Sequence, residues 1–416
     1  MRGTQGGQPL RVGFVGSGFI AHFHLRSLIG VRDVVVTGVY SRSQGKRRAF
    51  ADEVQRLNLG ACTTHATLDA MLAADDVDGV WILSPNDTRL DIMRGIHAAV
   101  TAGRSQVFAV ACEKPLARTI GEAQEMLQLA EAAQLNHGYL ENQVFSTAVE
   151  RGKEIIWRRA VPSTGRPYLA RAAEEHAGPH EPWFWQGPRQ GGGVLLDMMC
   201  HSVEVARYML TSPGADRSEL SLKAVNGTVA NLKWTRPRYA RELQQRMGAE
   251  VDYLKRASED FARGSLTLAD PDGNEVIIES STSWSYVGAG LRINLEMFGP
   301  EYAMEFSSIN APLKVFMSRA VSGAQGEDLV EKQNAEQGLM PVLDDEAGVY
   351  GYTGANRHMV QRFRAGKAPI ETFVDGVAVV EWLMALYHSA EQGCVIRPDE
   401  VDLGTFVPRV ARADDA

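Results

Sequence analysis

The segment Gly191–His201, GGGVLLDMMCH, carries two side chains capable of chemistry among apolar neighbours. Asp197 and His201 are four residues apart, so on a helix they would share one face, one turn from each other. An imidazole titrates near neutral pH and can act as a general base, while a carboxylate can accept a hydrogen bond from a substrate hydroxyl. The three glycines would let the backbone approach a cofactor or substrate closely. The alternative is a capped core helix with a satisfied, buried histidine.

A second chemical motif lies near the start of the chain, where GSGFIA (Gly16–Ala21) follows the apolar, β-prone run Arg11–Val15. The spacing matches the dinucleotide-binding fingerprint, with Ala21 in place of the third glycine. Gly16 would permit the tight turn, and Gly18 would let a pyrophosphate approach the backbone at the helix N-terminus. The motif predicts that NAD or NADP binds at Gly16, Gly18, Phe19 and Ile20.

The end of the second predicted strand, Val34–Ser41, should meet the adenosine ribose, where an NAD-specific site usually has Asp or Glu. This chain has Tyr40-Ser41-Arg42-Ser43, with Lys46 one turn further. Arg42 could pair with a 2′-phosphate, stack on the adenine or face solvent. Ser41, Arg42 and Lys46 are therefore expected cofactor contacts, and the choice between NAD and NADP stays open.

These motifs need a scaffold, and the hydrophobic pattern supplies one. Short apolar strands alternate with helical segments over residues 10–145, which predicts a Rossmann domain with a parallel sheet buried on both faces. Further strands are expected at Gly79–Ser84, Val107–Cys112 and Asn136–Glu141, and helices at Gln44–Leu57, Thr67–Ala73, Asp87–Ala102 and Thr119–Ala133.

Residues 146–416 are expected to form a second, α+β domain that would hold the substrate. Long alternating strands are expected at Leu220–Trp234, Phe261–Leu268, Glu275–Ser283 and Leu291–Phe298, and they predict a large, mostly antiparallel open sheet. The charged segment Thr235–Ser258 could be an oligomer contact, a lid or a solvated surface helix. The amphipathic segment Val374–Ser389 is expected to pack back onto the first domain.

Composition narrows the class of protein. A chain of 416 residues favours two domains. Its net charge of −8 does not favour binding to nucleic acid or to an anionic membrane, because both carry negative charge. The sequence has no stretch of about eighteen apolar residues that would predict a transmembrane helix. Four scattered cysteines form no CxxC pair, which favours a reducing cytoplasm and argues against structural zinc. A cytoplasmic enzyme without a metal is expected.

A third motif, Glu113-Lys114-Pro115, lies at the carboxyl end of a predicted parallel strand, where open α/β sheets bind their ligands. With GSGFIA before it and GGGVLLDMMCH after it, the chain resembles the glucose–fructose oxidoreductase, inositol dehydrogenase and rhizopine-catabolism family (Gfo/Idh/MocA) over roughly residues 10 to 400. The resemblance implies that Lys114 lies beside the nicotinamide and the substrate, and that Asp197 and His201 complete the catalytic group. It also implies a homo-oligomer, dimer or tetramer, formed through the open face of the second sheet.

One position departs from the family pattern. Arg89 stands where a histidine is common, four residues after Pro85, and could contact the cofactor, bind an anionic substrate group or form an ion pair on its helix. The remaining expected cofactor contacts lie at strand ends: Ser84, Pro85, Asn86, Glu113, Lys114 and Asn142.

The segment HAGPHEPWFWQGPRQ, residues 176–190, precedes the glycines and concentrates aromatic and polar side chains. Aromatic faces with polar edges suit a sugar ring. Two histidines four apart could bind zinc, but GPH is not helical and no third ligand is evident, so no metal is predicted. The expected substrate contacts are Arg171, His176, His180, Trp183, Trp185 and Arg189.

The first functional hypothesis is an NAD(P)-dependent oxidoreductase that takes hydride from a ring CH–OH of a sugar, glycoside or cyclitol. The second is an NAD-dependent glycoside hydrolase working by oxidation, elimination, hydration and reduction, as in relatives of this family that cleave sulfoquinovosides; Arg89, Arg166, Arg171 and Arg189 could then hold an anionic substituent. The third is a non-catalytic dinucleotide sensor, against which Lys114, Asp197 and His201 argue.

Overall fold

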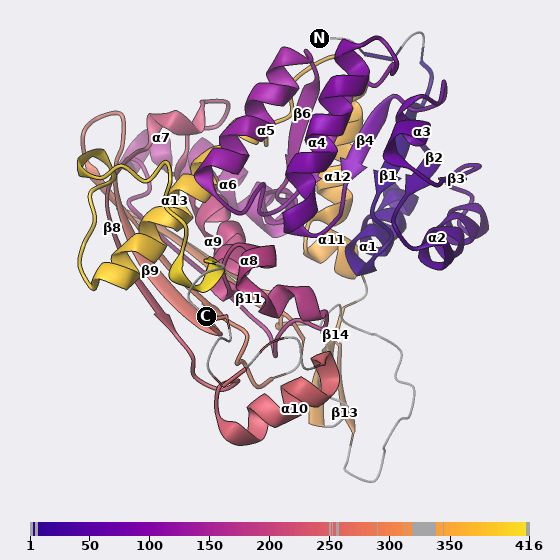
Figure 1. Cartoon of the computed structure of the whole chain (residues 1–416). Coiled ribbons are helices and arrows are strands. Elements are labelled where there is room, and N and C mark those ends of the chain that lie inside the picture. The colour runs from indigo at the N-terminus through magenta and orange to yellow at the C-terminus, as the bar shows by residue number, and fades with distance from the viewer. Residues whose placement is uncertain are drawn as a thin grey trace. The chain divides into compact units, whose positions relative to one another are not determined.

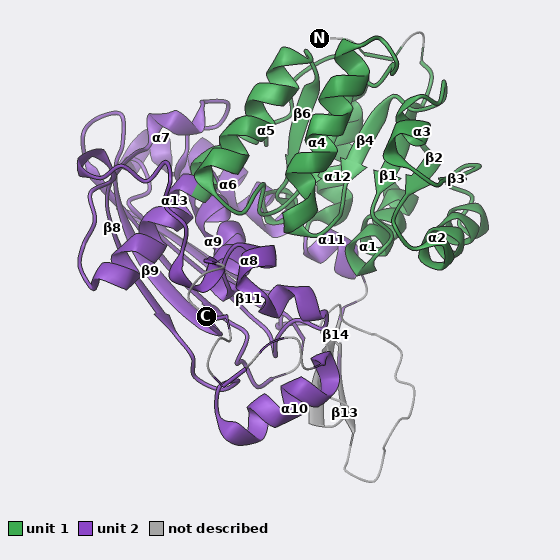
Figure 2. Cartoon of the chain, in the orientation of Figure 1, with its two compact units in different colours: residues 1–145, 351–380 green, residues 146–350, 381–416 purple. Residues whose placement is uncertain are grey.

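The computed structural model describes residues 3–4, 7–248, 251, 253–254, 258–288, 290–311, 313–317, 338–343 and 345–412. The chain divides into two compact units (Figure 2): unit 1 comprises residues 1–145 and 351–380, and unit 2 comprises residues 146–350 and 381–416. From the sequence, all of residues 146–416 were expected in the second domain. Unit 1 instead takes in a segment from late in the chain.

Unit 1 is built on a sheet of six parallel strands in the order β3-β2-β1-β4-β5-β6, which confirms the predicted Rossmann fold. The strands are β1 Leu10–Val15, β2 Val34–Tyr40, β3 Thr63–His65, β4 Gly79–Ile82, β5 Ala109–Glu113 and β6 Asn136–Leu140. Strands β4 and β5 are buried at every position, as apolar runs covered on both faces should be.

Several helices of unit 1 begin directly after a Ser or Thr that caps the helix N-terminus. Ser43, Thr67 and Thr119 each accept a hydrogen bond from a backbone N–H in the first turn of the following helix. Helices α4 and α5 cover one face of the sheet, and α1 and α12 cover the other (Figure 1). The helices are α1 Phe19–Ser27, η1 Leu28–Gly30, α2 Gln44–Arg56, α3 Leu68–Leu72, α4 Asn86–Thr101, α5 Ile120–Ala132, η2 Asn142–Phe145 and α12 Tyr352–Arg364.

Helix α12 explains why residues 351–380 belong to unit 1. Its side chains Met359 and Phe363 are fully buried. A Cβ on Gly138 of β6 would lie 2.5 Å from Met359 Sδ, so the absence of a side chain there makes room for the helix. Phe363 also packs edge-on against Trp81, with ring centroids 5.9 Å apart. The late segment therefore completes the core of the Rossmann unit.

Unit 2 is built on a six-stranded sheet in the order β12-β11-β7-β10-β9-β8. Only β7 and β10 pair in parallel, so the sheet is mostly antiparallel, as predicted. The strands are β7 Leu169–Glu175, β8 Ser221–Ala230, β9 Phe261–Ala269, β10 Glu275–Ser283, β11 Arg292–Gly299 and β12 Tyr302–Ser307. A separate pair joins β13 Leu313–Met317 to β14 Gly338–Val342.

Strand β7, LARAAEE, was not predicted because Ala and Glu are poor strand formers. Its buried residues Ala170 and Ala172 face helix α9, Val194–Leu210, which packs on this part of the sheet. Small side chains let the helix approach the strand closely. The central strand is therefore fixed by its helix more than by its own propensity.

The remaining elements of unit 2 surround this layer of helix and sheet. They are α6 Thr147–Arg159, α7 Val161–Thr164, η3 Pro182–Trp185, α8 Gly187–Gln190, η4 Arg217–Glu219, α10 Pro237–Met247, α11 Glu346–Val349, η5 Pro398–Glu400 and η6 Arg409–Ala411. Helix α13, Phe373–Gln392, contributes residues to both units. Among the described residues, no helix has the length and apolar character needed to cross a membrane.

The predicted strand Leu220–Trp234 ends early, at Ala230, because of Asp260. The Asp260 carboxylate accepts hydrogen bonds from three successive backbone N–H groups, of Leu232, Lys233 and Trp234, at 2.6–2.9 Å. The chain turns there and enters α10, which buries Ala240, Leu243 and Met247 and exposes most other positions. Part of the predicted charged insertion, including residues 249, 250 and 255–257, lies outside the described residues.

Candidate active site

The glycine turn after β1 has two glycines required for different reasons. Gly16 has φ +119°, and a Cβ there would lie 2.6 Å from the carbonyl oxygen of Leu83. Gly18 has an extended backbone, and a Cβ there would meet no atom within 4 Å. Gly16 is thus required by the fold, whereas Gly18 leaves open space at the N-terminus of α1. Ala21 is fully buried, as expected for a residue at which helix packs on strand.

This difference predicts opposite outcomes for two substitutions. Gly18→Asp should leave the melting temperature nearly unchanged and abolish NAD binding, because its carboxylate would face the pyrophosphate. Gly16→Ala should lower the melting temperature, because its Cβ collides with backbone. Calorimetric titration with NAD, alongside thermal unfolding, checks both. Unchanged NAD binding by Gly18→Asp would contradict the assignment of the turn.

The adenosine end of the predicted cofactor site is ordered by two serines. Ser17 Oγ lies 2.7 Å from Ser41 Oγ, which ties the glycine turn to the end of β2. Arg47 Nη1 donates to the carbonyl oxygen of Ser41 at 2.8 Å. Arg42 and Lys46 are exposed beside them. Sequence reasoning missed Ser17 and Arg47, although Ser17 lies inside the fingerprint itself.

The Glu113-Lys114-Pro115 turn directly follows β5 and is held by Arg89. Arg89 is buried on α4, and its guanidinium donates to the carbonyl oxygens of Ser84 (3.0 Å), Glu113 (2.7 Å) and Pro115. These bonds go to backbone carbonyls, in place of the ion pair on its helix that was one of the three roles predicted for Arg89. The arginine ties the loop after β4 to the loop after β5, and so fixes the backbone on both sides of Lys114.

The other expected cofactor contacts of unit 1 also follow strands. Ser84 Oγ accepts a hydrogen bond from Thr88 Oγ1 at 2.8 Å, and Pro85 is the N-cap of α4. Asn86 begins α4, and Asn142 begins η2 after β6; both are buried. Phe19 is 39% exposed at the start of α1, beside the half-buried Ile20. These residues follow β1, β4 and β6, at the sheet edge that also carries Lys114.

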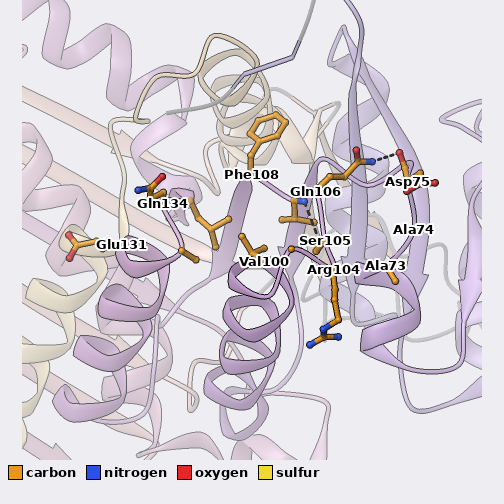
Figure 3. A pocket seen from close by; sticks show the side chains of 14 residues that line it. Ala73, Ala74, Asp75, Val100, Arg104, Ser105, Gln106, Phe108, Glu131 and Gln134 are labelled. Carbon is orange, nitrogen blue, oxygen red and sulfur yellow. Dashed lines mark hydrogen bonds between the residues drawn. The ribbon is translucent and has the colours of Figure 1, made fainter.

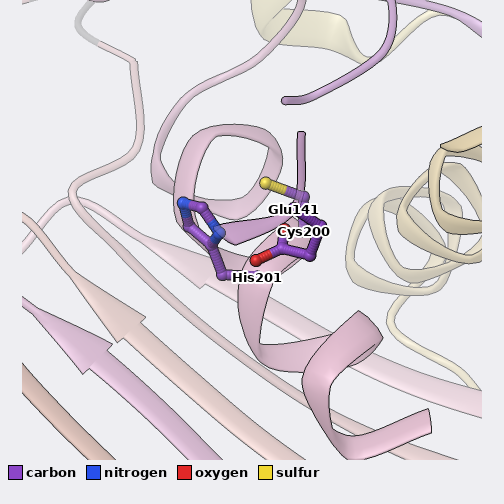
Figure 4. Close-up of side chains that lie close together, drawn as sticks. All are labelled: Glu141, Cys200 and His201. Atoms are coloured by element: carbon purple, nitrogen blue, oxygen red, sulfur yellow. The ribbon is translucent and has the colours of Figure 1, made fainter. Parts of the chain in front are cut away.

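The second group of candidates lies on α9 of unit 2. Asp197 and His201 are both 3% exposed and four residues apart on this helix, which confirms that the segment is helical. Figure 4 shows the imidazole of His201 and the sulfur of its neighbour Cys200. Cys200 Sγ donates to the carbonyl oxygen of Asp197 at 3.1 Å, so the thiol is occupied within the helix.

The glycines before α9 pack against protein. A Cβ on Gly192 would lie 2.2 Å from the hydroxyl oxygen of Tyr387, and one on Gly193 would lie 2.4 Å from Glu259 Oε2. The sequence analysis explained these glycines by close approach to cofactor and substrate. The structure gives a different reason within unit 2: two buried polar side chains stand where glycine Cβ atoms would be.

Glu259 and Tyr387 together cap α9. Glu259 Oε1 accepts from the backbone N–H of Leu195 at 3.2 Å and from the Tyr387 hydroxyl at 2.5 Å. The Tyr387 oxygen accepts from the N–H groups of Gly193 (2.9 Å) and Leu196 (3.3 Å). Donors that a helix N-terminus normally leaves unsatisfied are thus used internally. We call Glu259 and Tyr387 the α9 clamp; sequence reasoning missed both residues.

The α9 clamp predicts a pH dependence of stability. Burial raises the pKa of Glu259 from 4.5 to about 7. The folded chain therefore retains a proton between these pH values that the unfolded chain has lost, and the free energy of unfolding should decrease as pH rises through this window, by about 3 kcal/mol at most. Tyr387, whose pKa burial raises well above 10, does not titrate there.

Glu259→Gln is the matched variant, because its amide oxygen keeps both hydrogen bonds and cannot titrate. Denaturant unfolding at several pH values should show that the difference in stability between the two proteins changes between pH 4.5 and 7. A constant difference would contradict the raised pKa.

The predicted substrate loop of unit 2 divides into buried and accessible residues. Trp185 is fully buried and packs edge-on against Trp284 and Trp234, with centroids 5.0 and 5.8 Å away. His176 is also fully buried, and its Nδ1 accepts from the backbone N–H of Gly178 at 3.0 Å. Both residues lie in the core of the unit, which corrects their expected role as sugar contacts.

Three of the predicted substrate contacts in that loop keep exposed surface. His180 is exposed; Trp183 is half-buried and stacks on Phe184 at 3.9 Å; and Arg189 is half-buried with Nη1 3.4 Å from Gln186 Oε1. These three remain the candidates for a substrate contact.

Two arginines expected to meet an anionic substrate have acidic partners instead. Arg171 lies on the open face of the unit 2 sheet, opposite α9, with Glu279 Oε2 at 2.6 Å and Glu296 Oε2 at 3.6 Å. Arg166 donates to Glu219 at 2.7 Å and to Ser212 at 2.8 Å. The sequence could not reveal these pairs because each joins residues distant in the chain.

A hollow of about 940 Å³ in unit 1 lies where the chain enters β4, β5 and β6 (Figure 3). Lys114, in contrast, follows the end of β5. The lining of the hollow comes from the loops that enter these strands, including Asp75, Gln106 and Gln134. Gln106 Nε2 donates to the backbone carbonyl of Asp75 across it. The hollow is therefore separate from the loops that carry the predicted cofactor contacts.

Two family models match the chain. Residues 10–139 match the oxidoreductase family with the NAD-binding Rossmann fold (Gfo/Idh/MocA), and residues 162–301 match the Gfo/Idh/MocA C-terminal domain. Together they cover both sheets described above, apart from the last strands of unit 2.

Curated relatives match about half of the chain. A 1,5-anhydro-D-fructose reductase from Ensifer adhaerens is 28% identical over 219 residues, 52% of this chain and 61% of the relative. A myo-inositol 2-dehydrogenase from Thermotoga maritima is 23% identical over 203 residues, 48% of this chain and 55% of the relative. The matched segments thus span less than two thirds of either relative.

Among solved structures, GenD2 from gentamicin A biosynthesis in complex with NAD is similar over nearly the whole chain. It is 25% identical, has a TM-score of 0.74, and the match covers 95% of this chain and 98% of that one.

Proposed function

Because this chain belongs to the Gfo/Idh/MocA family of oxidoreductases, whose NAD-binding Rossmann domain it contains, we propose that it transfers hydride between NAD(P) and a ring CH–OH carbon of a sugar, glycoside or cyclitol. The observation that carries the proposal is the anchored turn after β5. Arg89 and the end of the strand hold Lys114 at the sheet edge where doubly wound folds bind their ligands.

The residues of unit 1 suit a dinucleotide. The open space at Gly18 and the N-terminus of α1 fit a pyrophosphate, and no side-chain cap occupies that helix end. The bound nicotinamide would accept or supply the hydride. Gly16, Gly18, Phe19, Ile20, Ser41, Arg42, Lys46, Ser84, Pro85, Asn86, Glu113, Lys114 and Asn142 remain the proposed contacts.

In this proposal, three side chains provide the proton transfer, the hydrogen bond to the reacting oxygen and the orientation of the substrate. His201 takes the proton from the reacting hydroxyl, since an imidazole titrates near working pH. Lys114 donates a hydrogen bond to the reacting oxygen. Asp197, one turn before His201 on α9, accepts from a neighbouring hydroxyl and orients the ring.

The experiment is a panel of sugars, glycosides and cyclitols with NAD and with NADP, scored for reduced cofactor and for free aglycone. Reduced cofactor that accumulates with a neutral cyclic substrate supports the proposal. Release of aglycone without net reduction would indicate the redox-neutral glycosidase, and cofactor binding without turnover on the whole panel would indicate a sensor. Exposed Arg42 and Lys46, with no acidic residue at the end of β2, are the reason for testing both cofactors.

The arginines give the glycosidase hypothesis little support. It drew on Arg89, Arg166, Arg171 and Arg189 as ligands for an anionic substituent. Arg89 donates to backbone carbonyls, and Arg166 and Arg171 have carboxylate partners. Arg189 is partly exposed, with its Nη1 3.4 Å from the neutral amide oxygen of Gln186. A neutral substrate is therefore favoured.

The open face of the unit 2 sheet is the proposed contact between copies of the chain. It holds a hollow of about 580 Å³ lined by polar and charged side chains, among them Arg263, Glu279 and Asn294. Light scattering should give the mass of a dimer or tetramer, and a monomer at working concentration would contradict this proposal.

A further inference from the structure

A chain of buried polar side chains runs behind the Glu113-Lys114-Pro115 turn, entirely within unit 1. His24 on α1 and Asn356 on α12 are fully buried, and Glu113 is 2% exposed. His24 Nε2 lies 2.7 Å from Glu113 Oε1, and His24 Nδ1 lies 2.9 Å from Asn356 Nδ2. The other carboxylate oxygen, Glu113 Oε2, accepts from the backbone N–H of Lys114 at 3.1 Å.

The direction of these hydrogen bonds follows from one donor. Trp81 Nε1–H, which can only donate, lies 2.9 Å from Asn356 Oδ1 and so fixes the orientation of the amide. Asn356 Nδ2 can then only donate, and the acceptors around it are Ser27 Oγ at 2.7 Å, His24 Nδ1 at 2.9 Å and the carbonyl oxygen of Tyr352 at 3.1 Å. With Nδ1 as acceptor, the proton of His24 is on Nε2 and is donated to Glu113.

Glu113 receives this proton while buried. Burial acts to raise its pKa. The interactions with His24, through the hydrogen bond and through charge, come first among the causes that lower it, followed by the positive charges of Lys114 and Arg89, and together they leave the pKa below 4.5. The carboxylate is thus ionised and held at both oxygens. Its charge lies directly before Lys114 in the chain, where a negative neighbour favours the ammonium form of a lysine.

We propose that His24, oriented by Trp81 and Asn356, is a positioning residue that keeps Glu113 ionised and turned toward the Lys114 main chain. The inference rests on the proposed function of Lys114 as donor to the reacting oxygen. It also assigns Glu113 a role that the sequence analysis did not: Glu113 supports the lysine and the turn in addition to lying among the expected cofactor contacts.

The test replaces His24 with Leu, which fills space without donating, and with Gln, whose amide N–H can still donate to Glu113. His22→Gln is the matched control, because His22 lies on the same helix but contacts Glu53 of α2. In His24→Leu, Glu113 Oε1 loses its donor, so the pKa of Glu113 should rise and its carboxylate should no longer be held in place beside Lys114. We expect kcat to fall by about 10- to 100-fold, with little change in the KM for cofactor.

The pH profile separates positioning from a loss of packing. In His24→Leu, the fall of kcat at alkaline pH should begin at lower pH than in the wild type, by about one unit, whereas His24→Gln should restore the wild-type position. His22→Gln should keep both kcat and the profile. A folded His24→Leu protein with an unshifted alkaline limb would overturn the proposal.

A second measurement needs no substrate. Nitrogen-15 NMR of labelled histidine, assigned through His24→Gln, should show Nε2 protonated and Nδ1 unprotonated. An Nδ1–H tautomer would overturn the inference and leave the proposed function intact. A wild-type protein that shows the expected tautomer but oxidises nothing in the panel would instead contradict the proposed function.

Discussion

His201→Ala is expected to lower kcat by about 10²–10⁴-fold while leaving NAD(P) binding intact, because a positioned general base contributes that much to a proton transfer. His201 is almost fully buried on α9, and its replacement leaves the α9 clamp, two turns away, untouched. Steady-state kinetics on the substrate found by the panel, together with calorimetric titration of the cofactor, measure the two quantities separately.

Companion variants show whether His201 acts with its proposed partners. Lys114→Ala should reduce kcat comparably, and the double variant should lose less than the sum, because both groups act on the same hydroxyl. Asp197→Asn should also raise KM, since it removes a charged acceptor from a substrate hydroxyl. If His201→Ala folds, binds cofactor and turns over at the wild-type rate, the histidine belongs to the core and the catalytic assignment is wrong.

Gly192→Val should destabilise unit 2 by about 3 kcal/mol or more, although residue 192 carries no catalytic group. Its Cβ would lie 2.2 Å from the Tyr387 hydroxyl, which is itself fixed by Glu259 and by two N–H groups at the start of α9. Neither the tyrosine nor the backbone can move without breaking the cap of the helix. Denaturant unfolding gives the loss of free energy directly.

A double-mutant cycle identifies the cause of that loss. Gly192→Ala and Tyr387→Phe should each destabilise the protein, the first through the collision and the second through lost acceptors. Together they should cost less than the sum, because removing the hydroxyl also removes the atom nearest to the new Cβ. Additive costs would show that Gly192 is required for some other reason.

Much of the architecture was predictable from the sequence, because the hydrophobic periodicity and the turn and capping residues agree with the final fold. The glycine turn, the strands β1, β2, β4, β5 and β6, and the strands β9, β10 and β11 lie within a few residues of their predicted bounds, whereas the short strand β3 was not predicted. Strand β7 was not predicted, because its stability comes from the packing of α9 on Ala170 and Ala172. The local sequence pattern of a strand does not show that a helix distant in the chain will pack on it and stabilise it.

The candidate site was predictable only where its residues lie in short motifs. Lys114, Asp197 and His201 could be identified from motifs, whereas Glu259, Tyr387 and Asn356 could not, since each meets its partner more than sixty residues away in the chain. The arginines show the converse error. Their charge suggested a ligand, but Arg89 satisfies backbone carbonyls and Arg171 satisfies carboxylates, and neither partner is visible in the local sequence.

The inclusion of residues 351–380 in unit 1 has a consequence for how the protein is made on the ribosome. When residue 145 emerges, the strands of the first sheet are complete, but Trp81 still lacks the Asn356 oxygen and Gly138 faces no helix. The Rossmann core can close only after the whole of residues 146–350 has been synthesised. The nascent first domain therefore keeps apolar surface exposed until α12, which begins at Tyr352, has been synthesised.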